Sequence, residues 1–231
     1  MINARAATIK DIIIIINQTI LFCFNQTPIN KNRNYFYNVI SNKNHCTKYI
    51  IFKDKKYNNN EKQSLSIPFI KTPTKKNFCL VLDLDETICH SMKLNFGNYF
   101  FLRPGTIEFL EEISKYYEII IFTSSPKEYA DDILDKIDKN GEFISHRLYK
   151  SHVIFEKGKS IKNLNLIGRD LNKIIFVDNM RCNAKYNLKN LYLIPSWTDD
   201  IYDDEIYKLK NKLKYIYESG KYNNDITKGL K

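Results

Sequence analysis

Two aspartates one residue apart, Asp83 and Asp85, follow directly after the apolar run Phe78 to Leu82. Residues two apart in an extended chain point to the same side, so the two carboxylates face one way while Leu84 points back toward apolar surroundings. Carboxylates held close together repel each other unless a cation or a proton lies between them. The pair therefore indicates a site for metal binding or proton transfer. A solvated turn is the alternative, because Asp is a frequent turn residue.

The same pattern of an apolar run ending in polar residues occurs twice more. Glu118 to Thr123 reads EIIIFT, and Lys173 to Asp178 reads KIIFVD with Asn179 directly after it. Runs that are apolar on both faces are typical of parallel strands covered by helices, which predicts an α/β fold. Helical patterns are expected at Gly105–Tyr116, Lys127–Asp138 and Ser160–Gly168.

Ligands of open α/β sheets bind at the carboxyl ends of the strands. The polar residues at those ends are therefore expected to converge on one crevice: Asp83, Asp85, Thr123, Asp178 and Asn179.

The chain resembles the haloacid dehalogenase (HAD) superfamily, in its branch of RNA polymerase II carboxyl-terminal-domain phosphatases, the FCP/SCP-like or NLI-interacting-factor-like family. The motifs that carry the resemblance occur in order over roughly residues 73 to 220: DLDET from Asp83, LRPG from Leu102, FTSS from Phe122, HRLY from His146, IKNL from Ile161, IGRDL from Ile167, VDN from Val177 and PSWTDD from Pro195. The resemblance implies a HAD-like Rossmannoid three-layer sandwich with a central parallel sheet and a small β-hairpin insertion.

The resemblance also implies roles for single residues. Asp83 is expected to be the nucleophile that forms an aspartyl-phosphate, and Asp85 the general acid and then the base. Mg²⁺ is the implied cofactor, bound by the Asp83 carboxylate, the backbone carbonyl of Asp85 and the Asn179 side chain, with Asp178 beside them.

Further residues of the same motifs are implied at the substrate. Lys162 is expected to neutralise charge on the phosphate and on Asp83, while Thr123, Ser124 and Arg147 bind the substrate. Each has an ordinary alternative: a solvated helix face for Lys162, a strand-to-helix cap for Thr123 and an exposed hairpin position for Arg147.

The function expected from these features is a Mg²⁺-dependent phosphoserine or phosphothreonine protein phosphatase whose partner is a phosphorylated protein, the RNA polymerase II C-terminal tail being one candidate. Two alternatives stay open. One is a binding module of the same fold, of the mitochondrial import-receptor or scaffold type, and the other is a HAD phosphatase for a small phosphorylated metabolite.

Two departures from the family pattern concern the walls of the site. The stretch Ile88 to Phe101 is shorter than the hairpin that relatives often carry there, and VDNMRCN lacks the serine and proline that commonly follow the DN pair. A hairpin is expected within Gly141 to Gly158, with FISHRLY and HVIFE as its strands, and a plain extension of the sheet by these two runs is the alternative.

The composition divides the chain into three parts. Residues 1–76 hold 13 of the 36 Lys and Arg but 3 of the 26 Asp and Glu, which leaves 23 of each sign for the rest. We therefore predict a basic, Asn/Lys-rich extension at residues 1–72 that is disordered or serves targeting, a phosphatase domain at 73–220 and a frayed tail at 221–231. Asp203–Tyr217 shows helical spacing of apolar residues and is expected to be a helix on the sheet.

Because the catalytic part is close to neutral, basicity does not indicate direct nucleic-acid binding. The apolar run Ile12–Phe24 is shorter than the ~20 residues that a membrane span needs, so no span is expected there.

The five cysteines form no C-x-x-C pair, which argues against a zinc site or a disulfide scaffold. We expect a monomer. The resemblance favours nucleus or cytoplasm, whereas the basic extension is compatible with a mitochondrion or another organelle.

Overall fold

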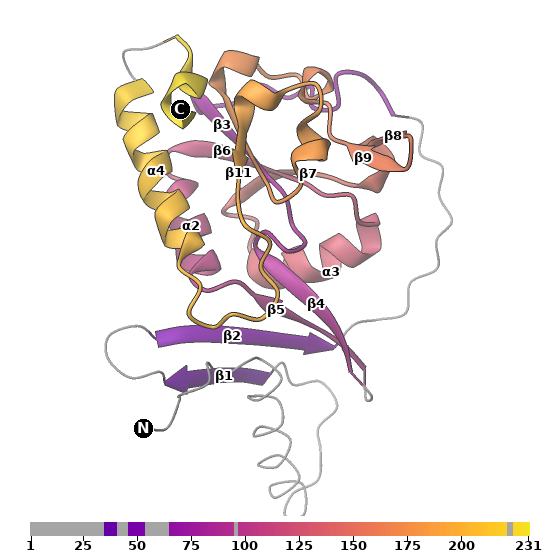
Figure 1. The fold of residues 1–231 in the computed structure, drawn as a ribbon, viewed down its shortest axis with the longest axis vertical. Coiled ribbons are helices and arrows are strands. Elements are labelled where there is room, and N and C mark those ends of the chain that lie inside the picture. Colours follow the sequence, from indigo (N-terminus) through magenta and orange to yellow (C-terminus); the bar gives the residue numbers. More distant parts are fainter. Residues whose placement is uncertain (1–34, 41–45, 54–64, 95–96, 221–223) are drawn as a thin grey trace, which may run out of the picture.

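The computed structural model describes residues 35–40, 46–53, 65–94, 97–220 and 224–231. Five parallel strands form its central sheet: β3 (Phe78–Leu82), β6 (Tyr117–Phe122), β7 (Ile144–Leu148), β10 (Ile174–Asp178) and β11 (Leu191–Leu193). Their order is β11-β10-β3-β6-β7, so the strand that precedes Asp83 lies in the middle (Figure 1). Leu82 pairs with Val177 on one side and Ile121 on the other. The carboxyl ends of the three central strands therefore lie together.

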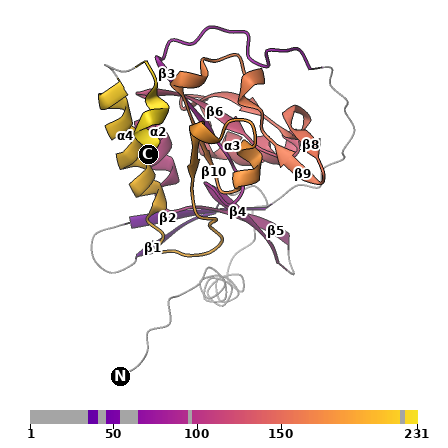
Figure 2. The same ribbon diagram turned by 45° about the horizontal axis from the view of Figure 1, so that its top comes forward.

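The three described α-helices pack on one face of this sheet: α2 (Thr106–Ile113), α3 (Lys127–Ile137) and α4 (Glu205–Gly220). Their apolar residues share one core with alternate residues of the strands, such as Leu80, Ile119 and Ile175. α2 and α4 lie side by side in both views (Figures 1 and 2). All residues of β3, β6 and β10 are buried, as expected for strands covered on both faces.

The opposite face is covered by short 3₁₀ helices and loops, among them η2 (Leu164–Leu166) and η4 (Arg181–Ala184). Ile70, Leu164 and Ile167 pack there against Val81, Ile120 and the other strand residues of a second core. The predicted α/β class, the central parallel sheet and the helices near 105–116, 127–138 and 203–217 are confirmed.

The prediction of a helix at Ser160–Gly168 is wrong. The segment begins as strand β9 (Lys159–Ile161) and continues as the single 3₁₀ turn η2. The Asn163 side chain accepts a hydrogen bond from the Asn165 backbone N–H, and Gly168 ends the segment with a φ of 89°. An Asn side chain that bonds its own backbone competes with helix propagation, and the chain instead lies flat on the sheet.

The predicted pairing of FISHRLY with HVIFE is also wrong. The first run forms β7 and joins the edge of the central sheet parallel to β6. The second run contains β8 (Ile154–Glu156), which pairs antiparallel with β9. A small hairpin insertion therefore exists, but it lies one strand further along the chain than the sequence predicts.

A second, antiparallel sheet has the order β1-β2-β5-β4 and includes β4 (Cys89–Leu94) and β5 (Gly97–Leu102). Their hairpin is extended by β2 (Cys46–Lys53), which pairs with β5, and then by β1 (Tyr35–Ile40). The run Ile12–Phe24 lies outside the described residues. Within the described part of the chain, no helix is both long and apolar enough to cross a membrane.

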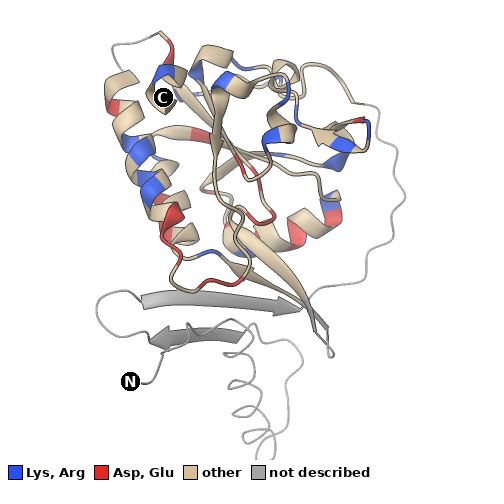
Figure 3. Ribbon diagram, viewed as in Figure 1, with Lys and Arg blue, Asp and Glu red and all other residues tan. Residues whose placement is uncertain are grey.

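The last described residues pack against the domain. Residues 226–230 form the 3₁₀ helix η6 (Ile226–Leu230), and the Ile226 side chain is buried in the core shared with α4. The expected fraying of the tail therefore does not apply to these residues. Residues of both charge signs occur along the described part of the ribbon (Figure 3).

Candidate active site

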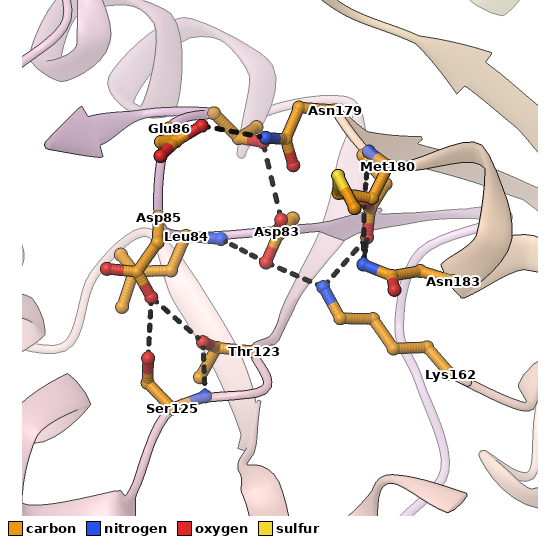
Figure 4. A network of polar contacts seen from close by, with 12 residues as sticks. Asp83, Leu84, Asp85, Glu86, Thr123, Ser125, Lys162, Asn179, Met180 and Asn183 are labelled. Carbon is orange, nitrogen blue, oxygen red and sulfur yellow. Dashed lines mark hydrogen bonds and ion pairs between the residues drawn. The ribbon is translucent and has the colours of Figure 1, made fainter. Parts of the chain in front are cut away.

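Asp83 takes its position from the end of the central strand. Its backbone N–H donates to the carbonyl of Val177 at 3.0 Å, and the residue is buried, with 6% of its surface exposed. Oδ1 lies 2.6 Å from Lys162 Nζ and accepts the Leu84 N–H at 2.8 Å, whereas the one contact of Oδ2 among the described residues is with Thr87 Oγ1 at 3.5 Å. One carboxylate oxygen is therefore fixed and the other is left for chemistry (Figure 4).

Lys162 lies fully buried between Asp83 and Asp178. Its Nζ donates to Asp178 Oδ2 at 2.8 Å. Burial alone would lower the pKa of Lys162, but the two carboxylates outweigh it and raise that pKa, so the side chain stays an ammonium. Burial raises the pKa of Asp83 to about 7 against the lowering effect of Lys162. Two carboxylates facing one ammonium leave an excess of negative charge that a further cation would balance.

Asp178 is held by hydrogen bonds on both oxygens. Oδ1 accepts the Met180 N–H at 2.7 Å, and Nδ2 of Asn183 lies 3.0 Å from Oδ1 and 3.1 Å from Oδ2. The Lys162 N–H also donates to the Asn183 carbonyl at 2.8 Å. Both oxygens of Asp178 are therefore already hydrogen-bonded. The side chain orients Lys162 and the loop after β10.

Asp85 lies half-buried on the turn after β3, while Leu84 is fully buried, as the alternation of side chains predicts. The turn is completed by Glu86, which has a φ of 57°. Three hydroxyls surround the Asp85 carboxylate: Tyr129 donates to Oδ1 at 2.7 Å, and Ser125 and Thr123 donate to Oδ2 at 2.7 and 3.4 Å. Hydroxyl donors of this kind hold the side chain in one orientation.

Asn179 follows β10 and turns its amide nitrogen away from Asp83. Nδ2 donates to Ser196 Oγ at 2.9 Å and lies 3.4 Å from Glu86 Oε2. The amide oxygen is thereby left on the other side of the group (Figure 4). An amide oxygen beside a carboxylate oxygen is a suitable pair of donors for a hard cation.

Comparison with known proteins shows the family to which the chain belongs. A sequence model of the NLI interacting factor-like phosphatase family matches residues 78–225. The chain belongs to this family. CTD small phosphatase-like protein 3 of Caenorhabditis elegans is 34% identical over 168 residues, which are 66% of this chain and 58% of the relative.

Human carboxy-terminal domain RNA polymerase II polypeptide A small phosphatase 1 is 31% identical over 159 residues, 62% of this chain and 60% of the relative. The chain thus spans less than two thirds of the length of these two phosphatases. A solved structure of the fission yeast RNA polymerase II CTD phosphatase Fcp1 is 20% identical with a TM-score of 0.44, covering 66% of this chain and 54% of that one.

Six of the eight residues that the sequence predicts for the site gather at this edge of the sheet: Asp83, Asp85, Thr123, Lys162, Asp178 and Asn179. Ser124 follows Thr123 directly, and its Oγ is buried without a hydrogen-bond partner in the described structure. An unpaired buried hydroxyl is costly, and a role for Ser124 at the substrate stays a prediction.

Arg147 forms ion pairs with two aspartates of α3. Its Nη1 donates to Asp131 at 3.0 Å and to Asp135 at 2.6 Å. The guanidinium therefore links the edge strand β7 to the helix, and a role at the substrate stays a prediction.

Sequence reasoning missed four residues of the site: Ser125, Tyr129, Glu86 and Ser196. A signal for Tyr129 existed, because it falls in the first turn of the helix predicted from Lys127, shortly after the FTSS motif that holds Ser125. Ser196 depends on the path of the loop before α4, which no periodicity reveals.

Members of this phosphatase family are typically magnesium-dependent. Among the described residues, no three His, Cys, Asp or Glu side chains form a metal cluster. The oxygen set at Asp83 and Asn179 does not need one, because Mg²⁺ keeps several waters and takes few protein ligands.

Proposed function

We propose that this chain is a Mg²⁺-dependent protein phosphatase for phosphoserine or phosphothreonine that works through an aspartyl-phosphate. The observation that carries the proposal is the asymmetry of the Asp83 carboxylate. Oδ1 is bound by Lys162 at 2.6 Å and by the Leu84 N–H at 2.8 Å, while Oδ2 has no partner closer than 3.5 Å in the part of the chain that the structure describes. A carboxylate held by one oxygen presents the other as a nucleophile.

In the first step, Oδ2 of Asp83 forms a bond to phosphorus, and the bond between phosphorus and the serine or threonine oxygen breaks. Asp85, two residues further on, gives its proton to that leaving oxygen. In the second step Asp85 takes a proton from water, which attacks phosphorus, releases inorganic phosphate and restores the Asp83 carboxylate. Asp85 is close enough to Asp83 along the chain to serve both steps on one phosphate.

Charge on the phosphoryl oxygens is balanced by the chain's own groups. Lys162 is a buried cation beside the nucleophile, and Thr123 and Ser124 carry hydroxyls at the end of the neighbouring strand. Such preorganised groups stabilise the transition state because they need no reorganisation when charge develops.

The residues that would hold Mg²⁺ are Asp83, through its carboxylate, Asp85, through its backbone carbonyl, and Asn179, through its amide oxygen. The excess negative charge around Lys162 supports a cation here. A bound Mg²⁺ supplies charge neutralisation for the phosphate as it approaches the Asp83 carboxylate. Asp178, whose oxygens are already bound to Lys162, Met180 and Asn183, supports the site from behind.

We propose a phosphorylated protein segment as the substrate class. In the described residues between Thr87 and Thr123, the chain forms the hairpin β4–β5 and helix α2, which leaves no room for a cap domain over the site. The human relative is named for the RNA polymerase II carboxy-terminal domain. The RNA polymerase II C-terminal tail is therefore one candidate among phosphoproteins.

The test compares the full chain with Asp83→Asn and with a matched control, Asp170→Asn. Asp170 is an exposed aspartate whose Oδ1 accepts the Asn172 N–H, a role that asparagine retains. Hydrolysis of an aryl phosphate and of phosphopeptides is expected to need Mg²⁺, to stop in excess chelator and to fall by roughly a thousandfold in Asp83→Asn but not in the control.

Sugar phosphates provide the comparison for substrate class. Faster turnover of sugar phosphates than of phosphopeptides would favour a metabolite phosphatase. A folded wild-type chain without activity on any of them would contradict the proposal and favour a binding module of the same fold.

A further inference from the structure

The loop between β11 and α4, residues 194–204, crosses the site and is fixed to it at several points. The Ile194 N–H donates to the Asp178 carbonyl at 3.2 Å, and the Trp197 N–H donates to the Glu86 carbonyl at 2.8 Å. Trp197 itself is buried, with 1% exposed, and its Nε1 donates to the Asp200 carbonyl. The loop is therefore hydrogen-bonded both to the end of β10, directly before Asn179, and to the turn after Asp83.

Arg103 of the LRPG motif also binds this loop. Its guanidinium is buried and forms a bidentate ion pair with Asp203 at 2.7 and 2.8 Å. Nη1 donates to the carbonyls of Thr87 at 3.1 Å and Pro195 at 2.9 Å. A planar guanidinium with all these acceptors fixes the relative position of the turn and the loop.

Ser196 lies between these two anchored residues, Pro195 and Trp197, and its side chain is exposed. Its Oγ accepts a hydrogen bond from Asn179 Nδ2 at 2.9 Å. Glu86 Oε2, 3.4 Å from the same nitrogen, can only accept, so the group that faces it must be the NH₂ end of the amide. With the nitrogen turned to Ser196 and Glu86, the amide oxygen is directed to the opposite side (Figure 4).

We propose that Ser196 is a positioning residue for the Mg²⁺ site: it fixes the orientation of the Asn179 amide, and Arg103 fixes the loop that carries Ser196. This inference rests on the proposed function. Groups that orient a metal ligand typically change metal affinity by about 10- to 100-fold when they are removed. Without Ser196, the amide nitrogen keeps only the weaker 3.4 Å contact with Glu86 among the described residues, and the amide would populate the flipped orientation, in which the NH₂ end repels the cation.

The test uses the full chain with Ser196→Ala, Ser196→Thr and Thr198→Ala. Thr198 lies exposed on the same loop, and within the described structure its hydroxyl bonds to no residue other than its neighbour Asp199. The Mg²⁺ dissociation constant is measured by calorimetry, and turnover of an aryl phosphate is measured across Mg²⁺ concentrations. We expect Ser196→Ala to weaken Mg²⁺ binding about tenfold, with turnover recovering at high Mg²⁺. Ser196→Thr, which keeps the hydroxyl, and Thr198→Ala are expected to bind Mg²⁺ as the wild type does.

Equal Mg²⁺ dissociation constants for the wild type and Ser196→Ala would overturn the inference and leave the proposed function intact. So would a loss of turnover in Ser196→Ala that high Mg²⁺ does not recover. A wild-type chain that binds no Mg²⁺ would overturn both, and that outcome is recognised without any variant.

Discussion

At the scale of single residues, the site is organised around one buried cation. Lys162 Nζ lies 2.6 Å from Asp83 and 2.8 Å from Asp178, and none of its side chain is exposed. Burying a charge is costly unless it is paired and hydrogen-bonded, and here two carboxylates provide the pairing. The ammonium therefore stabilises the fold and fixes the nucleophile through the same contacts.

Removal of this cation leads to a first prediction. Lys162→Ala leaves two buried carboxylates facing each other, so we expect the free energy of unfolding to fall by about 3–5 kcal/mol. Urea denaturation measures this loss, and Mg²⁺ is expected to restore part of it by replacing the missing charge. Lys159→Ala, an exposed lysine three residues earlier, is the control and should change stability by less than about 0.5 kcal/mol. Equal stability of the two variants would contradict this account of Lys162.

At the scale of elements, strands were the most predictable part of the chain. The runs before Asp83, Thr123 and Asn179 are apolar on both faces, and the structure buries every residue of β3, β6 and β10. Because parallel strands end at one edge, their polar ends could be predicted to meet. Contacts that depend on the path of a loop, such as Ser196 with Asn179, have no comparable periodicity and were missed.

The predicted strand pairing is wrong where a short strand has more than one neighbouring strand with which it can pair. FISHRLY and HVIFE are adjacent and both have strand character, yet the first pairs with β6 and the second with β9. Local pattern does not choose between an edge of the central sheet and a neighbouring hairpin. The choice is made by tertiary packing, since Ile144 and Leu148 bury their side chains in the domain core.

A prediction at this scale concerns Gly168, where the backbone after η2 passes very close to the backbone of Ile70. Its φ is 89°, and a Cβ there would lie 2.5 Å from the Ile70 carbonyl oxygen. Gly158 has a similar φ of 75° but nothing within 4 Å of such a Cβ. We expect Gly158→Ala to cost about 1 kcal/mol from backbone strain, and Gly168→Ala about 3 kcal/mol or more, because the close approach must also be relieved.

Thermal or urea unfolding of the two glycine variants separates the two effects. The difference between them measures the close approach alone, since both carry the strain of a positive φ. Similar unfolding midpoints would contradict a tight contact between Gly168 and Ile70.

At the scale of the whole molecule, the boundary of the domain is decided by packing more than by charge. The composition changes near residue 76, and the expected boundary at residue 72 stays a prediction. Upstream of it, however, the Phe69 and Ile70 N–H groups donate to the Leu166 and Ile167 carbonyls at 2.8 and 3.1 Å. Ile70 is 6% exposed, and the Phe69 ring lies edge-on to His152 with centroids 4.9 Å apart. These residues cover the face of the sheet on which no described α-helix lies.

Two truncated chains, residues 65–231 and 71–231, test where the domain begins. The shorter one loses the buried Ile70 side chain, worth about 2 kcal/mol, and two backbone hydrogen bonds, worth about 1 kcal/mol each. We therefore expect its free energy of unfolding in urea to be lower by about 4 kcal/mol. Ile70→Ala in the longer chain should reproduce the side-chain share of that loss. If both truncated chains unfold at the same urea concentration, residues 65–70 contribute nothing to the stability of the domain, and a boundary at residue 72 becomes the better description.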